Sequence, residues 1–514
     1  MLSTANNNKA LRIGFENLIE KTEPVLCRVL EGSVPAWLRN TALYRTAPGM
    51  FNLPIEGSPD KTRRIHHWFD GLGSMHQFHV RDDGSVWYHN RFIATGARTA
   101  LSTSGRPPIM FGQPHDPCVT IFGKVAAVFN TLTSSHSLDD SNLNVTVSSM
   151  VHSLEPNTVA VKSDYNCLQL VDADTFETKK FVRYDAYDPK LNGAIAASHE
   201  EFDPVTNEYF NINMDRVGKH TGVFSMNADG VVREAVITTP PGRPSVYVHS
   251  FSSTAKYLIL TTTPCVVDPL KTLWYNNLAE AMTWQGDKHP VLFHVVERTS
   301  MTHVATFEAA TPFYFFHSIN AFDDGDDIVL DLVHYEDSRI VQEFAIPTML
   351  DGKCFSIPSR YARYRLNNLS AHRGHVLAPF PKVGAPKLAA APLLMELPTI
   401  NERFRHCKAY QFVYAVNVTD KSSRFFDSVV KLDVNTGDVL TWAPGDGFFP
   451  GEPMFVPNPN EEAEDAGVLL TVVLDGHGKR SYLVVLDAKD LSVVARVEAP
   501  VVVPLGFHGM HKAK

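Results

Sequence analysis

Short hydrophobic runs rich in β-branched residues alternate with polar turns along most of the chain, and long helical periodicity is scarce. The clearest case is an aromatic run at residues 311–320, an acidic turn containing glycine, and an apolar run at residues 328–334. This pattern predicts a β-hairpin. His317 lies in its apolar first strand, where a ring that has lost water needs a partner at each nitrogen. A metal ion with a second acceptor would meet that need, and so would hydrogen bonds to backbone in an ordinary core.

A hydrophobic strand followed by a polar turn and a return strand recurs along the chain. Clear copies occupy residues 167–178, 429–440 and 483–494, and looser copies occupy residues 223–232 and 293–307. Such a unit is typical of a propeller blade. Because the copies are spread widely, we predict an all-β fold with one closed propeller, and the chain length suits about six to eight blades.

Three regions interrupt this pattern. Residues 96–118 and 262–285 predict long loops, and the second contains a short amphipathic helix. The apolar side of that helix holds Leu273, Trp274, Leu278 and Met282. Apolar loops on one rim would admit an apolar substrate or touch a membrane surface. Residues 370–392 are rich in Ala, Pro, Gly and Lys and predict a surface connector.

Composition limits the classes of function. Among 514 residues, 44% are hydrophobic and 20% are charged, as in a globular protein with a large core. The net charge of -9, without a long basic block, argues against nucleic acid as a partner. Six cysteines without a C-x-x-C pair indicate neither a zinc ribbon nor a disulfide framework. The start carries no apolar signal core and no run of 18 apolar residues occurs, so we expect a cytoplasmic protein whose membrane contact is peripheral.

Four of the 22 histidines share the setting of an apolar run followed by a small or polar residue. They are His199, His249, His317 and His508. Their separations of 50, 68 and 191 residues would place them on different blades, whose inner strands converge on one axis. Imidazole suits iron, copper, nickel and zinc, but a common non-haem iron site uses two histidines and a carboxylate. The spacing therefore leaves a shared metal site and separate core histidines both open.

Several motifs occur in a characteristic order. They include Gly-Ser-Val-Pro-Ala-Trp-Leu-Arg at residues 32–39, Tyr-Arg-Thr-Ala-Pro-Gly-Met-Phe at 44–51, His-His-Trp-Phe-Asp-Gly at 66–71, Glu-Leu-Pro-Thr-Ile-Asn at 396–401 and Gly-Glu-Pro-Met-Phe-Val at 451–456. From about residue 14 to its end, the sequence resembles the carotenoid cleavage oxygenases. The resemblance is to the animal and fungal branch with the β-carotene oxygenases and the retinal pigment epithelium isomerohydrolase. It implies a single seven-bladed propeller domain over residues 1–514, with long loops and short helices capping one face and residues 1–13 disordered.

The resemblance also implies a site. Its metal would be Fe(II), bound by His199, His249, His317 and His508, with Asp164, Glu396 and Glu452 orienting three of these rings. Asp164 stands where the family usually has Glu, so we expect a longer or water-mediated hydrogen bond and weaker iron retention. Candidates for lining the substrate tunnel are Phe69, Phe313, Phe316 and Phe507. We expect structural roles for His66, His67, His303, His334 and His511, the last of these in a frayed terminus.

The activity implied by the resemblance is cleavage of a double bond in an apolar polyene by dioxygen, and specifically central cleavage of β-carotene or a related carotenoid to retinal. A stilbenoid-cleaving dioxygenase is the first alternative, disfavoured because Ser163 occupies the position of a phenol-binding Lys. A retinyl ester isomerohydrolase is the second, because the same iron can act as a Lewis acid. A propeller that only binds partners is the non-enzymatic alternative. Peripheral membrane contact is expected, but Val119 replaces the basic residue usual after Cys118, which argues against lipidation there.

Overall fold

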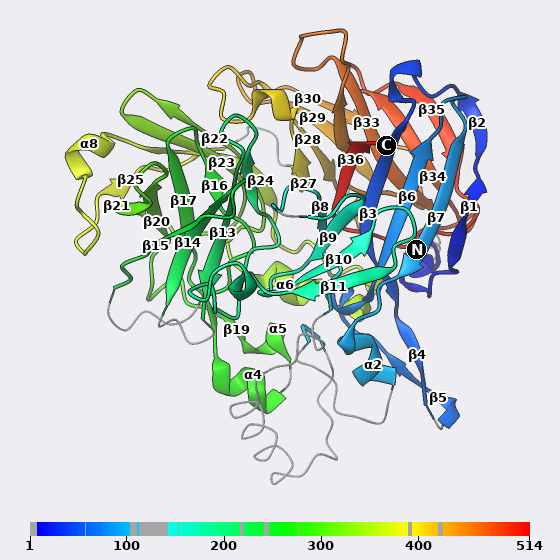
Figure 1. Ribbon diagram of the computed structural model, residues 1–514, viewed down its shortest axis with the longest axis horizontal. Coiled ribbons are helices and arrows are strands. Elements are labelled where there is room, and N and C mark those ends of the chain that lie inside the picture. The colour runs from blue at the N-terminus through cyan, green and yellow to red at the C-terminus, as the bar shows by residue number, and fades with distance from the viewer. Residues whose placement is uncertain are drawn as a thin grey trace.

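The computed structural model describes residues 8–56, 58–102, 110–112, 142–152, 154–215, 220–240, 246–275, 277–388, 393–419 and 425–514. Seven sheets of four or more strands form the blades of a β-propeller, which confirms the predicted fold class (Figure 1). Blade 1 has the order β1 (Lys21–Leu26), β7 (Val86–Phe92), β6 (Leu72–Val80), β3 (Thr41–Met50) and β36 (Gly509–Ala513). Blade 2 has the order β11 (Thr178–Val182), β10 (Leu168–Asp172), β9 (Thr158–Lys162) and β8 (Thr146–Ser148).

The next three blades follow in chain order. Blade 3 contains β12 (Glu201–Asp203), β13 (Glu208–Met214), β14 (Thr221–Asn227) and β15 (Val232–Val236). Blade 4 contains β16 (Ser252–Ser253), β17 (Tyr257–Thr262), β20 (Leu292–Glu297), β21 (Thr302–Ala309) and β25 (Lys382–Val383). Blade 5 contains β22 (Ser318–Asp324), β23 (Asp327–Tyr335), β24 (Ser359–Leu366) and β26 (Lys387–Leu388).

Strands from both ends of the chain close the ring. Blade 6 contains β27 (Glu396–Thr399), β28 (Phe412–Asn417), β29 (Ser428–Asp433) and β30 (Val439–Trp442). Blade 7 has the order β2 (Arg28–Gly32), β35 (Val493–Glu498), β34 (Arg480–Asp487), β33 (Gly467–Asp475) and β31 (Phe448–Pro450), and β32 (Met454–Pro457) also pairs with β33. The N-terminal strand β2 therefore completes the last blade, while β36 pairs with β3 in the first (Figure 1). His511 lies within β36, so the expectation of a frayed end was wrong.

The predicted repeats at residues 167–178, 429–440 and 483–494 are the hairpins β10–β11, β29–β30 and β34–β35. All three turns begin with an aspartate, and the residue four positions later adopts a positive φ. The pairs are Asp172 with Phe176 (φ 59°), Asp433 with Gly437 (φ 83°) and Asp487 with Leu491 (φ 61°). In each pair the later N–H donates to the aspartate carbonyl, at 2.9, 2.8 and 2.9 Å. The aspartate side chains also accept N–H groups inside the turn, so one local chemistry builds all three.

The hairpin around His317 forms, but its predicted bounds were wrong. Strand β22 begins only at Ser318, and the turn is the pair Gly325 and Asp326, with φ 68° at the glycine. Most of the aromatic run at residues 311–317 precedes the strand, and only Tyr314 forms an isolated bridge there, to Tyr335. The rings of this run alternate between two core clusters, with Phe313 and Phe315 in one and Tyr314 and Phe316 in the other. The acidic residues Asp323 and Asp324 extend the strand rather than form the turn.

Short helices and two small sheets accompany the blades. The helices are η1 (Ile13–Phe15), η2 (Ala36–Leu38), η3 (Trp68–Asp70), α2 (Gly96–Ser102), η5 (Tyr184–Ala186), α4 (Pro269–Tyr275), α5 (Leu278–Ala281), α6 (Arg339–Glu343), α7 (Ile346–Leu350), α8 (Leu369–His372) and η6 (Glu402–Phe404). The small sheets are β4 (Asn52–Ile55) with β5 (Ser58–Arg64), and β18 (Cys265–Val267) with β19 (Met282–Trp284). Figure 1 shows α2, α4 and α5 together on one side of the blades.

The predicted amphipathic helix at residues 262–285 is two helices, α4 and α5. The side chain of Asn277 caps α5 by accepting the N–H of Glu280 at 3.0 Å, which starts a new helix there. Met282 is buried, while Trp274 remains 40% exposed. The side chain of Leu273 and the residue Cys118 lie outside the described residues. In the described parts of the chain, no helix is long and apolar enough to cross a membrane.

Two further segments differ from expectation. Residues 8–12 form a helical turn that leads into η1, and Ala10, Leu11 and Ile13 are buried, so the predicted disorder does not extend to residues 8–13. The surface connector at residues 370–392 includes β25 and β26, which add short outer strands to blades 4 and 5.

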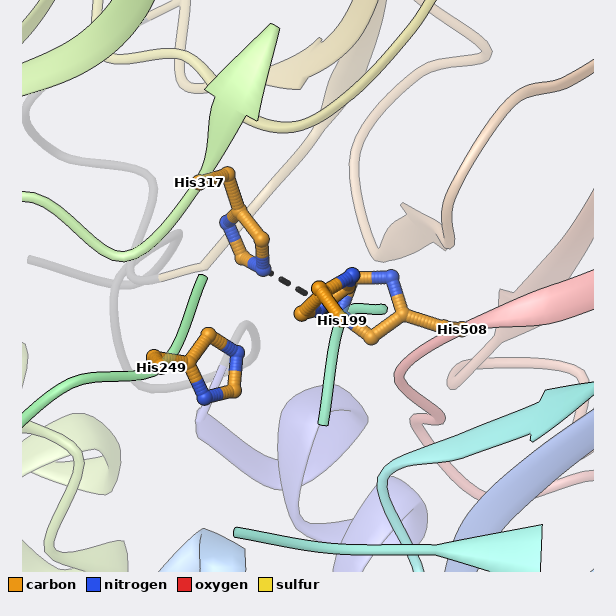
Figure 2. Close-up of side chains that lie close together, drawn as sticks. All are labelled: His199, His249, His317 and His508. Atoms are coloured by element: carbon orange, nitrogen blue, oxygen red, sulfur yellow. Dashed lines mark hydrogen bonds between the residues drawn. The ribbon is translucent and has the colours of Figure 1, made fainter. Parts of the chain in front are cut away.

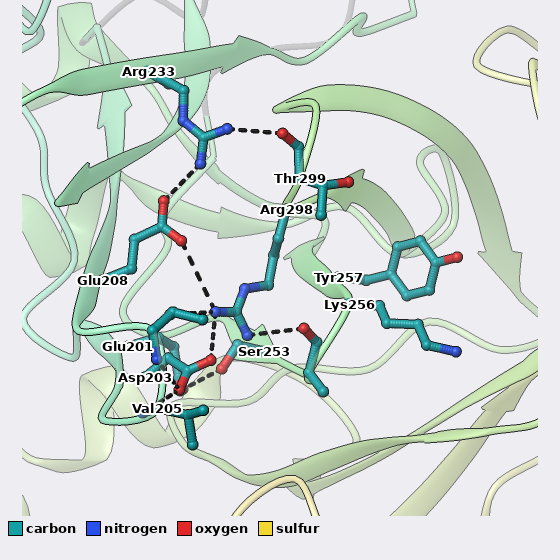
Figure 3. A network of polar contacts seen from close by, with 12 residues as sticks. Glu201, Asp203, Val205, Glu208, Arg233, Ser253, Lys256, Tyr257, Arg298 and Thr299 are labelled. Atoms are coloured by element: carbon teal, nitrogen blue, oxygen red, sulfur yellow. Dashed lines mark hydrogen bonds and ion pairs between the residues drawn. The ribbon is translucent and has the colours of Figure 1, made fainter.

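Buried ion pairs join neighbouring blades. Arg298, directly after β20 in blade 4, donates from Nη2 to Asp203 of blade 3 at 2.5 Å and from Nη1 to the carbonyl of Thr254 at 2.8 Å (Figure 3). Arg233 is exposed and donates to Glu208 within blade 3 at 2.7 Å and to the carbonyl of Thr299, in the turn after β20, at 2.8 Å. Removing Arg298 or Asp203 leaves an uncompensated charge in the core, so this pair helps to fix how blades 3 and 4 meet.

Candidate metal centre

Four histidines converge at one point. One nitrogen from each of His199, His249, His317 and His508 lies within 4.8 Å of the others (Figure 2). Nε2 of His508 lies 3.1 Å from Nε2 of His199 and 3.2 Å from Nε2 of His317. The sequence therefore identified four histidines that the fold brings together across as many as 309 residues of chain.

Each histidine stands just before the first strand of a blade sheet. His317 directly precedes β22 and His508 directly precedes β36, while His199 and His249 come two and three residues before β12 and β16. Those four strands lie at one edge of blades 5, 1, 3 and 4. Because the same edge of each blade faces the propeller axis, residues at equivalent positions meet there.

The remaining three blades supply carboxylates. Asp164 follows β9 of blade 2, Glu396 begins β27 of blade 6, and Glu452 lies between β31 and β32 of blade 7. The Nδ1–H groups donate to them: His249 to Asp164 at 2.9 Å, His317 to Glu396 at 2.5 Å, and His508 to Glu452 at 2.7 Å. Every blade thus contributes one residue to a constellation of four imidazoles and three carboxylates.

The hydrogen bond between Asp164 and its histidine is only slightly longer than those of the two glutamates. Its bond to His249 is the longest of the three and is nonetheless direct. Asp164 Oδ2 also accepts the Tyr247 hydroxyl at 2.5 Å, and Oδ1 accepts the N–H of Ser198 at 2.9 Å and its hydroxyl. Four donors therefore hold the shorter carboxylate in place.

The pKa shifts in the site favour ionised carboxyl groups and neutral rings at His199 and His508. Burial by itself would raise the pKa of Asp164, Glu396 and Glu452, but the adjacent histidines and hydrogen-bond donors outweigh it and hold each pKa below its ordinary value. Burial, followed by the neighbouring histidines, lowers the pKa of His199 well below its ordinary value. Burial also lowers the pKa of His508, although Glu452 opposes this.

This arrangement fits a cation. His317 and His508 each donate Nδ1–H to a carboxylate, and a neutral imidazole that donates from Nδ1 carries a lone pair and no proton on Nε2. These two lone pairs face each other across 3.2 Å with no hydrogen between them. A metal ion at the shared point satisfies both, and four imidazole nitrogens suit a first-row transition metal.

Three of the four tunnel candidates lie together beside the histidines. The ring of Phe69 lies 5.9 Å from that of Phe316 and 5.6 Å from that of Phe507, which directly precede His317 and His508. The Phe316 ring also meets His249, at 5.7 Å. The rings thus form an apolar wall next to the four-histidine cluster.

Phe313 lies elsewhere. It packs against Phe293, His334 and Tyr364 in the core between blades 4 and 5. The prediction named it with Phe316 because both lie near motifs that match the family, but the two rings belong to different core clusters. His67 has a structural role as expected: Nε2–H donates to the Val341 carbonyl at 2.7 Å and Nδ1 accepts the N–H of Phe69 at 3.2 Å.

Comparison with known proteins identifies the family of this chain. The family model described as retinal pigment epithelial membrane protein matches residues 14–513. The chain belongs to this family of carotenoid oxygenases. The torulene dioxygenase of Fusarium fujikuroi is 30% identical over 97% of this chain and 92% of its own length. The β,β-carotene 15,15′-dioxygenase of Mus musculus is 27% identical over 96% of this chain and 90% of its own.

Solved structures share the fold of this carotenoid oxygenase. A variant of the Synechocystis apocarotenoid oxygenase has a TM-score of 0.78 at 20% identity and covers 99% of both chains. The lignostilbene dioxygenase of Pseudomonas brassicacearum has a TM-score of 0.74 at 21% identity and covers 97% of both chains. At these identities the likeness establishes the propeller and not the substrate.

Several residues around the carotenoid oxygenase site were not predicted. Tyr247 bonds Asp164, and Tyr335 donates its hydroxyl to Glu396 at 2.6 Å. Lys162 is buried and pairs with Glu200, next to His199. Arg45 is buried near Glu452. For Tyr247 a signal existed, because it stands two residues before His249 and so on the same side of an extended chain.

Proposed function

We propose that this protein is a non-haem Fe(II) dioxygenase that cleaves a carbon–carbon double bond of a carotenoid or apocarotenoid. The observation that carries the proposal is the convergence of four histidines, three of them fixed by buried carboxylates. Relatives that align over nearly the whole chain are named carotenoid dioxygenases, including one from Neurospora crassa at 29% identity. When bound, Fe(II) supplies a centre that activates dioxygen for insertion into the double bond.

The chain's own residues would prepare that centre. His199, His249, His317 and His508 would hold the iron, and Asp164, Glu396 and Glu452 keep three rings in the tautomer whose Nε2 lone pair faces the metal. Because burial and neighbouring rings keep the pKa of His199 and His508 low, protons compete weakly for these ligands at neutral pH.

The aromatic wall would orient the substrate. Phe69, Phe316 and Phe507 present rings beside the histidine cluster, which exclude water and fit a flat apolar polyene. Their π faces favour positive charge that develops along the polyene as its double bond is attacked. Both effects suit a carotenoid better than a charged or strongly polar substrate.

At the next level of detail, we propose central (15,15′) cleavage of β-carotene or a related C40 polyene to retinal. The β,β-carotene 15,15′-dioxygenase of Mus musculus and the torulene dioxygenase of Fusarium fujikuroi both support a long polyene. Torulene is therefore the competing substrate within the same class. The bond that is cut depends on how far a polyene slides past Phe69 before it stops.

The experiment is anaerobic loading with Fe(II), followed by air and a panel of β-carotene, torulene, apocarotenals and resveratrol, with products identified by mass. Retinal as the main product from β-carotene supports central cleavage, and products only of other lengths would reject it. Retinyl ester is included in an anaerobic arm, because isomerohydrolysis needs no dioxygen. A phenolic aldehyde from resveratrol, with all carotenoids untouched, would reject the carotenoid proposal.

A stilbenoid substrate is less well supported. Ser163 cannot pair with a phenolate as a lysine can, and the neighbouring Lys162 is buried against Glu200. The lignostilbene dioxygenase shares the fold at 21% identity, which carries no substrate preference.

Peripheral membrane contact belongs to the same proposal. Helix α4 exposes Leu270 and Trp274 on the side of the molecule where α2 and α5 also lie (Figure 1). An exposed Leu and Trp on a short helix suit the interface of a lipid bilayer, from which carotenoids are drawn. Sedimentation with phosphatidylcholine vesicles should fall when both residues are changed to Ser, and unchanged sedimentation would reject this contact.

A further inference from the structure

Arg45 is a buried cation beside the proposed iron site that the proposed mechanism does not use. It lies in β3 of blade 1, in the motif at residues 44–51, and is 4% exposed. Its Nη2 donates to the carbonyl of Phe507 at 3.0 Å, one residue before His508. It also lines a small internal cavity with Trp68 and Phe425. A guanidinium stays protonated in proteins, so a full positive charge is fixed there.

Two glycines make room for this guanidinium. A Cβ atom at Gly451 would lie 3.0 Å from both Nη atoms of Arg45, and one at Gly506 would lie 3.4 Å from Nη2. Gly451 directly precedes Glu452, and Gly506 precedes Phe507. Strand β3 and the loops that contain Gly451 and Gly506 therefore enclose the charge, near Glu452 but without a direct bond to it.

Arg45 and Glu452 act on each other electrostatically. Burial by itself would raise the pKa of Glu452, but His508 and, to a smaller degree, the charge of Arg45 hold it below its ordinary value. Glu452 in turn opposes the lowering of the Arg45 pKa by burial. Among the described residues, no ion pair within 4.0 Å joins Arg45 and Glu452 directly. The guanidinium therefore acts on the carboxylate by longer-range electrostatic attraction and not by a bidentate hydrogen bond.

The charges around the cluster can be counted. Three ionised carboxylates, Asp164, Glu396 and Glu452, each bond one ligand histidine. One guanidinium, Arg45, opposes them, so the carboxylates and the guanidinium together carry a net charge of minus two. The pair Lys162 and Glu200 adds no net charge when both are ionised. A divalent ion neutralises such a site, while a trivalent ion leaves one positive charge in a low-dielectric core.

We infer that Arg45 sets the oxidation state that this site prefers, by destabilising ferric iron relative to ferrous iron. The inference rests on the proposed iron site and concerns how its charge is tuned. A buried positive charge repels Fe(III) more than Fe(II), because the interaction grows with the charge of the ion. For charges about 10 Å apart at an effective dielectric constant of about 20, one unit charge shifts such an equilibrium on the order of tenfold.

The test is a redox titration of the iron-loaded protein with mediators under anaerobic conditions. Ferric iron is followed by electron paramagnetic resonance as one electron leaves each ferrous ion for the mediator. Arg45→Met should shift the equilibrium toward Fe(III) on the order of tenfold, seen as a lower midpoint potential. Arg45→Lys keeps the charge and should remain within about threefold of the unmodified protein, since its ammonium reaches nearly the same place.

A double variant separates charge from local damage. Glu452→Gln removes one negative charge and should shift the equilibrium toward Fe(II). Arg45→Met combined with Glu452→Gln restores the net charge of minus two, so its midpoint should return toward that of the unmodified protein although two contacts are lost. If damage to packing decided the midpoint potential, both single variants would move it in the same direction. The double variant would then differ from the unmodified protein by more than either single variant.

Arg363→Met is the matched control. It removes a half-buried guanidinium, whose Nε and Nη2 each donate to the buried Asp331 at 2.8 Å in blade 5. It should lower thermal stability without moving the midpoint potential. Equal midpoints for Arg45→Met, Arg45→Lys and the unmodified protein would overturn the inference while leaving the iron site intact. Failure of the unmodified protein to bind iron would instead overturn the proposed function.

Discussion

Asp164 Oδ2 lies 2.9 Å from Nδ1 of His249 and accepts the Tyr247 hydroxyl at the same time. The equivalent bonds made by Glu396 and Glu452 are 2.5 and 2.7 Å. A carboxylate one methylene shorter than glutamate thus still reaches its histidine, because Tyr247 and Ser198 hold it in position. Metal retention at this corner of the site depends on a group of donors and not on the carboxylate alone.

Asp164→Asn should weaken iron binding by about 10- to 100-fold, because the amide offers one acceptor oxygen where the carboxylate offers two. Tyr247→Phe removes one donor and leaves the bond between Asp164 and His249, so it should weaken binding less. Competition against a chelator of known affinity measures both. Glu280→Gln in α5 serves as a control for loss of one carboxylate remote from the histidines. Equal affinity in Asp164→Asn and the unmodified protein would contradict this role.

His317→Ala should abolish stabilisation by metal. A ligand at 100 times its Kd stabilises a protein by about 2.7 kcal/mol, and this increment disappears when the site no longer binds. Thermal unfolding with and without Fe(II) under anaerobic conditions provides the measurement. His375→Ala, at an exposed position, should keep the full increment. An unchanged increment in His317→Ala would mean that the metal binds somewhere else.

Phe69→Ala should lower kcat/KM for a carotenoid at least about tenfold while iron affinity stays unchanged. Its ring touches those of Phe316 and Phe507 but bonds none of the histidines, so its loss opens the apolar wall without removing a ligand. Phe69→Leu keeps much of the volume and should show a smaller effect. Steady-state kinetics combined with iron quantification tests this, and parallel loss of iron and activity would assign Phe69 to the metal site instead.

The sequence predicted the features that depend on local pattern. The repeated aspartate turns at Asp172, Asp433 and Asp487 use contacts within five residues, so their hairpins were found correctly. The four histidines stood out because each is a polar residue next to an apolar run. The three carboxylates have no such local signal and came from the family resemblance.

What the sequence could not predict depends on which blades meet. Arg45 matters because blade 1 lies against blade 7, which brings it near Glu452, more than 400 residues later. Phe313 and Phe316 differ because successive rings of residues 313–316 alternate between two core clusters, so Phe313 enters the core between blades 4 and 5 and Phe316 reaches the site. The alternation places the two rings on opposite sides, but which side faces the site follows from tertiary packing.

The propeller should lose stability in acid because it buries neutral histidines that are not part of the four-histidine cluster. Burial lowers the pKa of His67, His89 and His334 to about 4, against an ordinary value of 6.5. As pH falls below 6.5, these histidines become protonated in the unfolded chain but stay neutral in the folded chain. The free energy of unfolding therefore decreases between pH 6.5 and 4. Each such histidine lowers the free energy of unfolding by about 1.4 kcal/mol per pH unit over that interval.

The variant His89→Phe isolates the contribution of one buried histidine to this loss of stability in acid. The imidazole stacks on Phe176 with ring centroids 4.4 Å apart, and its Nε2 has no hydrogen-bond partner, so a phenyl ring keeps the stacking and loses only a backbone contact near Asp174. At pH 7.5 the variant should be close to the unmodified protein in stability or slightly below it. At pH 5, about 1.5 units below the ordinary pKa, it should gain roughly 2 kcal/mol relative to the unmodified protein. Urea unfolding at the two pH values measures this difference, with exposed His375→Asn as the control. A stability difference that stays the same at both pH values would show that His89 titrates alike in the folded and unfolded chains, and acid lability would then have to come from the other buried histidines.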